Sequence, residues 1–320
     1  MSSKGTQFKT GLLHPRHWPI WLAFGLWRAV TALPYPLLLL LGKGIGLFIH
    51  RFPSRRKTIA KRNIELCFPD QSSDQNKAML RVNFINMGIA LMEVGIAWWW
   101  SKKRFAKLLQ FEGLENLSAI KDRGVMLLGI HYTTLEIGTA GISSVFPMDG
   151  MYRAHGNPVY DFLQARGRLN QGLGDGMVFE RRDVRGTMKA LKNGRSLWYG
   201  PDQDYGLGQG LFVPFFGMQA ATVYATARFA QKTGAAVVPF SHVRLPGTKG
   251  YKITVYPALE DFPVGDDVVD TSRINQLVEK MVLLQPEQYL WVHRRFKNRP
   301  EGEADLYNLP DRKKRRRKAT

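Results

Sequence analysis

The sequence predicts an α/β fold in which a mixed central sheet is flanked by helices and preceded by an N-terminal membrane-associated helical segment. From about residue 125 onward, short apolar runs of strand length alternate with helical segments, which is the pattern of such folds. Residues 18–41 carry a single charge and are rich in Leu and Trp, as in a membrane segment. We expect three parts: an N-terminal hydrophobic membrane anchor (residues 1–52), one globular domain (53–305) and a basic, disordered tail (306–320).

The N-terminal apolar segment is long enough to cross a bilayer, but it is interrupted. It reads WPIWLAFGLWRAVTALPYPLLLLL from Trp18 to Leu41, and Pro34 and Pro36 should kink or end a helix there. One tilted span and two helices in the membrane interface are both compatible with this pattern. Lys and Arg are more frequent just after the segment than before it, so the positive-inside rule places the following domain in the cytoplasm.

Beyond the anchor, helices come first and strands follow. Apolar periodicity and glycine or proline stops predict helices at 55–66, 73–100, 135–143, 158–169, 222–233 and 272–284, with another after Asp183. Short apolar runs predict strands at 125–130, 148–152, 177–179, 196–199, 235–244 and 251–256. This alternation predicts a sheet that lies between layers of helices.

The charge and the cysteine content limit the partners and the compartment. The chain has 46 Lys and Arg against 26 Asp and Glu, a formal net charge of +20, so it attracts anionic lipids, nucleic acid or an acidic carrier protein. Tryptophans 98–100 stand beside the cations at 102–104, a mixture typical of membrane interfaces, which favours a membrane over nucleic acid. Cys67 is the only cysteine, which excludes an intrachain disulfide and a multi-cysteine zinc site.

The segment GIHYTTLE, residues 129–136, joins a predicted strand to a predicted helix. If the strand ends at His131, the imidazole lies at the carboxyl edge of the sheet, where open α/β folds bind ligands. Glu136, in the first helical turn, can then reach back to the ring. A carboxylate bonded to one ring nitrogen fixes the tautomer and makes the other nitrogen a better base. We therefore predict that His131 and Glu136 act as a pair that removes a proton from an alcohol.

Several motifs together resemble those of one enzyme family. The pattern His131-x4-Glu136 after an apolar strand resembles the signature of the glycerolipid acyltransferases. The late acyltransferases of lipid A biosynthesis are similar in five stretches: LLHPRHWPIWL, NIELCFPD, GIHYTTLE, WYGPDQDYG and PEQYLWVHRRFKNRPEG. The form HYTTLE resembles the lauroyl and palmitoleoyl branch more than the myristoyl branch. The resemblance extends to about residue 303, so the basic tail is not part of it.

This resemblance implies an enzyme of the bacterial inner membrane with a glycerolipid-acyltransferase-like catalytic domain on the cytoplasmic side. Its donor would be an acyl-acyl carrier protein and its acceptor a Kdo-bearing tetra-acylated lipid A precursor. The product would be a secondary acyl ester on the 3-hydroxyl of an acyl chain already attached to the glucosamine disaccharide. The other implied partners are inner-membrane lipids. The resemblance implies no nucleic acid, no metal and no cofactor apart from the carrier thioester as co-substrate.

The same resemblance assigns further site residues. Arg168, at the end of the predicted helix 158–169, and Asp202, in the loop after the strand 196–199, match family site residues and are expected to stabilise an oxyanion or bind substrate. Arginine suits phosphate because its planar fork binds two oxygens at once. The residues expected to bind acceptor phosphates are Arg181, Arg182, Arg294 and Arg295.

Three other functions remain compatible with the sequence. A glycerol-phosphate or lysophospholipid acyltransferase would use the same His131 and Glu136 with a coenzyme A thioester. The run Asp202-Gln203-Asp204 also fits the D-x-D pattern of metal-dependent glycosyltransferases, which a chelator would inactivate. A non-enzymatic protein that binds membranes or nucleic acid would explain the charge, but it would leave His131 and Glu136 without a role.

Overall fold

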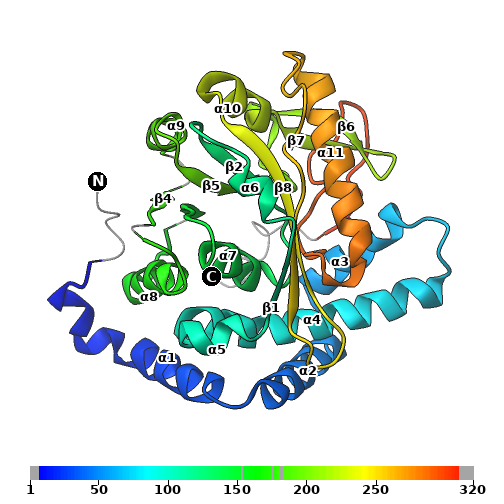
Figure 1. The fold of residues 1–320 in the computed structure, drawn as a ribbon. Helices are drawn as coiled ribbons and strands as arrows, with labels where there is room; N and C mark the ends of the chain where they lie inside the picture. Colours follow the sequence, from blue (N-terminus) through cyan, green and yellow to red (C-terminus); the bar gives the residue numbers. More distant parts are fainter. Residues whose placement is uncertain (1–6, 153, 175, 181–182, 310–320) are drawn as a thin grey trace.

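A computed structural model of the chain describes residues 7–152, 154–174, 176–180 and 183–309 (Figure 1). Its α-helices are α1 (Trp18–Thr31), α2 (Tyr35–Arg51), α3 (Arg55–Cys67), α4 (Ser73–Trp99), α5 (Lys102–Ala106), α6 (Glu115–Ser118), α7 (Leu135–Ser143), α8 (Pro158–Leu169), α9 (Val184–Lys192), α10 (Ala225–Thr233) and α11 (Asp267–Leu284). Its strands are β1 (Leu109–Glu112), β2 (Val125–Leu128), β3 (Gly150–Tyr152), β4 (Val178–Glu180), β5 (Ser196–Tyr199), β6 (Gly210–Phe215), β7 (Met218–Val223), β8 (Ala236–Arg244) and β9 (Tyr251–Val255).

A five-stranded mixed sheet organises the domain. Its strand order is β1-β9-β8-β2-β5, and only the pair β8 and β9 is antiparallel. Every residue of β2 is buried, because helices cover both faces of the sheet. Val125 and Leu127 face a cluster that includes α6 and α7, whereas Met126 and Leu128 face a cluster that includes α3, α9, α10 and α11. This confirms the predicted α/β class with a mixed sheet between helices.

Two of the β-structures were not predicted. A β6–β7 hairpin occupies residues 210–223, so the helix expected from residue 222 begins only at Ala225. Strand β1 pairs in parallel with β9 and forms the edge of the main sheet. A separate parallel pair, β3 and β4, lies next to the other edge through an isolated bridge between Asp149 and Leu197 of β5.

The N-terminal apolar segment forms two helices, α1 and α2, which are separated at Ala32–Pro34. Helix α2 packs against α4 at backbone distance, because both helices carry glycine where they cross. A Cβ atom added to Gly88 would lie 2.2 Å from the carbonyl oxygen of Gly42 and 2.4 Å from the nitrogen of Gly46. The contact therefore tolerates no side chain, and α2 is held firmly against the domain.

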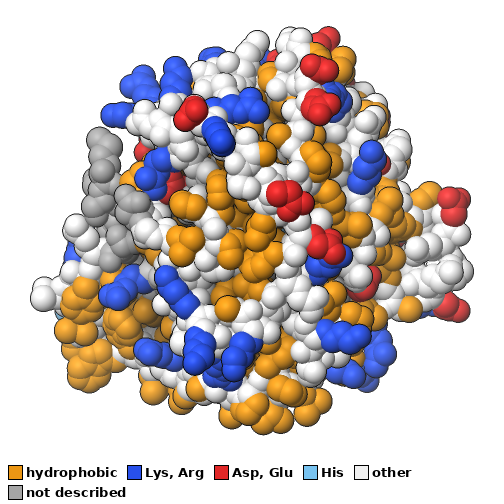
Figure 2. Space-filling model, viewed as in Figure 1, with side chains coloured by type: hydrophobic (Ala, Val, Ile, Leu, Met, Phe, Trp, Pro, Cys, Tyr) orange, Lys and Arg blue, Asp and Glu red, His pale blue; other side chains and the backbone are white. Residues whose placement is uncertain are grey.

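The outer faces of α1 and α2 are apolar and exposed. Figure 2 shows hydrophobic side chains along the lower edge of the molecule, over these two helices, with Lys and Arg side chains beside them. The exposed apolar residues include Leu22, Leu26, Leu37, Leu40 and Phe48. Such a patch marks a surface that contacts a membrane or a partner.

Helix length gives only weak support for a membrane span. Among the described residues, α4 is long and apolar enough to cross a bilayer, but 56% of its apolar window is buried inside the protein. Helices α2 and α3 pass the same test only as a pair bent by 92°.

We expect the protein to stay with membranes in high salt, because burial of apolar surface is not screened while surface charge is. Replacing Leu22, Leu26 and Leu40 by serine should release it into the soluble fraction, since all three side chains are largely exposed and contribute little to the core. The measurement is sedimentation of membranes after a salt wash. Serine at the exposed Leu283 and Leu284 of α11 is the matched control, and release of the unaltered protein by salt alone would contradict the expectation.

Candidate active site

His131 follows β2, an inner strand of the sheet, and lies at the carboxyl edge of the sheet, where the sequence predicts it. Gly129, two residues earlier, donates its N–H to the carbonyl of Tyr199 on β5 at 3.0 Å. A Cβ atom on Gly129 would lie 2.7 Å from Nε1 of Trp198 and 2.8 Å from Cε1 of Phe240. Only glycine therefore lets the chain leave the sheet here and place the imidazole at its edge.

The carboxylate that binds the imidazole belongs to Asp202, in the loop after β5. Its Oδ1 lies 2.6 Å from Nδ1 of His131, and its Oδ2 accepts the backbone N–H of the same residue at 2.9 Å. Burial alone would raise the pKa of the Asp202 carboxyl, but the nearby charge and the hydrogen bonds of His131 outweigh it and hold that pKa below its ordinary value. Asp202 is fully buried and ionised, so it fixes both the ring and the backbone of His131.

Glu136, the predicted partner of His131, instead forms an ion pair with Arg168 of α8. Nη2 and Nε of Arg168 lie 2.5 Å and 3.0 Å from Oε1, and the indole Nε1 of Trp98 donates to Oε2 at 2.8 Å. The predicted contact with the imidazole is therefore replaced, because Glu136 is turned towards α8 and α4. Burial alone would raise the pKa of the Glu136 carboxyl, but the charge and hydrogen bonds of Arg168, with the bond from Trp98, keep it below its ordinary value.

This ion pair borders a small, mostly apolar cavity of about 50 Å³ that extends towards β3 and β4. The cavity is lined by Leu135, Glu136, Thr139, Ser143, Met148, Gly150, Met151, Arg168, Leu169, Val178 and Trp198. Trp198 also packs edge-on against the ring of His131, with ring centroids 5.3 Å apart. Trp198 therefore links the cavity to the imidazole, and Arg168 forms part of the cavity wall.

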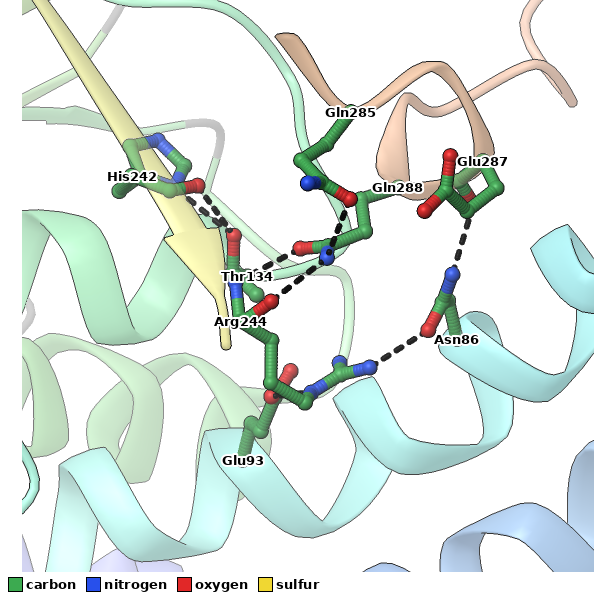
Figure 3. Close-up of polar contacts among 8 residues, drawn as sticks. All are labelled: Asn86, Glu93, Thr134, His242, Arg244, Gln285, Glu287 and Gln288. Atoms are coloured by element: carbon green, nitrogen blue, oxygen red, sulfur yellow. Dashed lines mark hydrogen bonds and ion pairs between the residues drawn. The ribbon is translucent and has the colours of Figure 1, made fainter. Parts of the chain in front are cut away.

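Hydrogen bonds on both sides hold the turn that carries His131. The carbonyl of His131 accepts the N–H of Leu290 at 2.9 Å. Thr134 Oγ1 lies 2.9 Å from Nδ1 of His242 and donates to the carbonyl of that residue at 2.8 Å (Figure 3). Burial lowers the pKa of His242 to about 3, so this imidazole is neutral and serves as a fixed support.

A buried polar network joins the turn to the long helix α4. The N–H of Thr133 donates to the carbonyl of Gln288, whose side chain bonds to the backbone of Arg244 on β8 through both its oxygen and its nitrogen. The guanidinium of Arg244 pairs with Glu93 at 2.7 Å and Asn86 at 2.6 Å, both on α4 (Figure 3). Removing one member would leave a buried charge or donor unpaired, so the network fixes the turn relative to α4.

The arginines predicted to bind acceptor phosphates differ in how accessible the structure shows them to be. Arg181 and Arg182 lie outside the described residues, and Arg294 is half-buried. Arg295 is only 2% exposed, and its guanidinium donates to the carbonyl of Ala221 on β7 at 2.7 Å. The expectation that Arg295 binds a phosphate conflicts with this placement, because a guanidinium enclosed by its own domain cannot reach a ligand outside it.

The two carboxylates of the D-x-D run do not face one another as a metal site would require. Asp202 binds His131, while Asp204 accepts hydrogen bonds from the backbone of Asn298 and Gly206. Across the part of the chain that the structure describes, no group of three or more His, Cys, Asp or Glu is arranged to hold a metal ion.

Trp98 and Gln288 were not predicted as site residues. Trp98 is buried, and its indole N–H reaches Glu136 from a helix 38 residues earlier. Gln288 lies within the predicted motif 286–302, and only its contact with Thr133 shows what it does. Neither contact leaves a signal in local sequence spacing.

Comparison with known proteins identifies the family of the chain. The family model of the bacterial lipid A biosynthesis acyltransferases matches residues 5–298. The lipid A biosynthesis lauroyltransferase of Escherichia coli K12 is 42% identical over 94% of this chain and 98% of that protein, and the palmitoleoyltransferase of the same strain is 39% identical over the same shares. The myristoyltransferase of that strain is 28% identical over 95% of each chain. A solved structure, the 1-acyl-sn-glycerophosphate acyltransferase of Thermotoga maritima, is 16% identical, covers 72% of this chain and 97% of its own, and superposes with a TM-score of 0.34.

These identities confirm the predicted family and its resemblance to the lauroyl and palmitoleoyl branch. The match covers both the N-terminal helices and the sheet that carries His131. The chain therefore belongs to the bacterial lipid A biosynthesis acyltransferases.

Proposed function

We propose that the protein transfers a fatty acyl group from an acyl-acyl carrier protein to the hydroxyl of a hydroxyacyl chain on a Kdo-bearing lipid A precursor, with His131 as the general base. The contact between Asp202 and His131, at the edge of the sheet and linked to an apolar cavity through Trp198, carries this proposal. The names of the lauroyl and palmitoleoyl relatives support the substrate class.

The pairing with Asp202 prepares His131 for proton transfer. Because the carboxylate accepts a hydrogen bond from Nδ1–H, the lone pair of the imidazole is on Nε2. Nε2 takes the hydroxyl proton as the acceptor oxygen attacks the thioester carbon. When the intermediate collapses, the carbon–sulfur bond breaks and the leaving thiolate takes that proton from the imidazolium. The products are an ester and a free carrier thiol.

Arg168 is the group we assign to the negative charge that develops on the thioester oxygen. Glu136 fixes the guanidinium through Nε and Nη2, and Nη1 makes no hydrogen bond with any described residue. A fixed donor of this kind typically contributes about 100- to 1,000-fold in rate. Glu136 then acts by positioning Arg168, in place of the predicted role as the partner of the base, and Asp202 takes that role.

The lining of the cavity and the charge of the chain support the proposed acyl donor and the proposed side of the membrane. Met148, Met151 and Val178 make the far wall of the cavity apolar, which suits the first carbons of an acyl chain. The net charge of +20 attracts an acidic carrier protein. A soluble carrier reaches the site only if the domain faces the cytoplasm, which agrees with the positive flank after the apolar segment.

The test is mass spectrometry of a Kdo-modified, tetra-acylated lipid A precursor after incubation with the protein and acyl-acyl carrier protein. We expect an increase by one acyl group. A matched acceptor whose 3-hydroxyl is replaced by hydrogen should not react, and a chelator should leave the yield unchanged. Acylation of glycerol 3-phosphate or a lysophospholipid in preference to the lipid A precursor would contradict the proposal.

A further inference from the structure

A groove of about 680 Å³ lies between α1, α4 and α8, and one of its lining residues is Trp98, whose indole N–H binds the Glu136 carboxylate. It is lined by Arg28, Trp98, Trp99, Phe162, Leu163, Arg166, Gly167, Leu169 and Asn170. No carboxylate is among these residues. The groove therefore combines an apolar floor with two positive charges.

The floor of the groove is aromatic and rigid. Trp98 is fixed by its hydrogen bond to Glu136 and by Trp99, which packs edge-on against it with centroids 6.0 Å apart. Gly167 lies directly against the indole, because a Cβ atom there would be 2.4 Å from Cγ of Trp98. A flat apolar surface with a few polar groups at its margin is typical of a small-molecule binding site.

Two arginines flank this floor from different helices. Arg28 is in the last turn of α1 and Arg166 in the last turn of α8, and both side chains are exposed. Neither guanidinium forms a hydrogen bond or ion pair with another residue that the structure describes, whereas Arg168, on the same helix as Arg166, is held by Glu136. The guanidinium of Arg166 lies 5.6 Å from the centroid of Phe162. Two guanidinium groups without a carboxylate beside an aromatic floor suit a phosphate attached to a ring.

The groove adjoins both the reaction centre and the exposed apolar face. Leu169 lines the groove and also the small cavity bordered by Glu136, Arg168 and Trp198. Arg28 lies on α1 between Leu26 and Val30, whose side chains are 60% and 38% exposed. A lipid whose chains remain in the membrane along α1 would therefore bring its headgroup to the groove.

We propose that this groove binds a glucosamine phosphate of the lipid acceptor, with Arg28 and Arg166 on the phosphate and the tryptophans against the sugar ring. The identity of the ligand rests on the function proposed above. The site differs from the predicted phosphate site at Arg294 and Arg295, because it is formed by the N-terminal helix and α8.

The experiment measures acyl transfer by Arg28→Ala, Arg166→Ala and the double variant in detergent micelles. Each single change should raise KM for a bisphosphorylated acceptor about 5- to 20-fold, with kcat within about twofold, because the lost contact is formed before the chemical step. The loss should shrink on an acceptor that lacks the matching phosphate. Arg166→Lys should restore part of the affinity. Arg123→Ala is the matched control, since this exposed arginine precedes β2, at the end of the strand away from His131.

The outcomes separate this proposal from the proposed function. An unchanged KM in the double variant, or an equal rise in KM for the carrier thioester, would overturn the phosphate assignment, and the second result would indicate that the groove docks the carrier. If the unaltered protein transfers no acyl group, the proposed function fails. The phosphate assignment is then tested by equilibrium binding of the bisphosphorylated glucosamine lipid. The double variant should lose this binding, and Arg123→Ala should keep it.

Discussion

Replacing His131 by alanine should lower kcat by about 100- to 10,000-fold, the range for a lost general base, with the fold retained. Asp202→Asn should cause a loss of similar size, because the amide keeps the shape of the carboxylate but no longer stabilises the imidazolium or fixes its tautomer. The measurements are kcat with the lipid A precursor and thermal unfolding of each variant.

Asp204→Asn is the matched control for Asp202→Asn. Both residues are buried in the same loop, but Asp204 binds Asn298 and Gly206 and has no contact with His131. We expect it to lower thermal stability more than kcat. If both changes reduced kcat equally, the loop as a whole would be responsible, and the assignment of Asp202 as the partner of the base would fail.

Replacing Glu136 by glutamine should lower kcat by about 100-fold or more and also destabilise the fold, because the largely buried Arg168 guanidinium loses its counter-charge. Arg168→Gln should have a similar effect on kcat. The double variant should lose little more kcat than either single variant, since both substitutions break the same ion pair.

A set of double-mutant cycles distinguishes this arrangement from the one predicted for His131 and Glu136. We expect strong coupling in kcat between His131 and Asp202, and between Glu136 and Arg168, with near-additive effects across the two pairs. Strong coupling between His131 and Glu136 would show that the two act together in the complex with substrate. Asp149→Asn is the control for ion-pair loss, because the pair of Asp149 with Arg195 is similarly buried and the Asp149 carboxylate binds Met177 and Arg195, not His131. It should lower stability with little change in kcat.

The sequence predicted the position of His131 because a local pattern determines it: an apolar run, a glycine and then polar residues. The partner of His131, by contrast, is not determined by a local pattern. Asp202 lies 71 residues away, and its distance from the ring depends on the parallel pairing of β2 with β5. Asp202 was identified as a site residue through a motif, but no spacing rule shows which carboxylate meets the imidazole.

The errors in the fold and in the site have related causes. The β6–β7 hairpin contains Pro214, which weakens a strand pattern, and an edge hairpin tolerates proline where a central strand does not. Arg295 lies in a run of cations that suggests an exposed surface, whereas its guanidinium fills a polar gap between β7 and α11. For both Pro214 and Arg295, contacts with residues distant in the sequence outweigh the local preference of the residue type.

The order of synthesis of the chain has a consequence for when the enzyme becomes competent. The turn that carries His131 is completed by backbone bonds from Gln288 and Leu290, and Asn63 of α3 is bonded to the carbonyl of Trp291. A ribosome exposes α3 and β2 long before it reaches these residues. The nascent protein therefore exposes the apolar faces of α1 and α2 before the turn that carries His131 has its backbone partners, so acyl transfer begins only after this last segment has packed onto the domain.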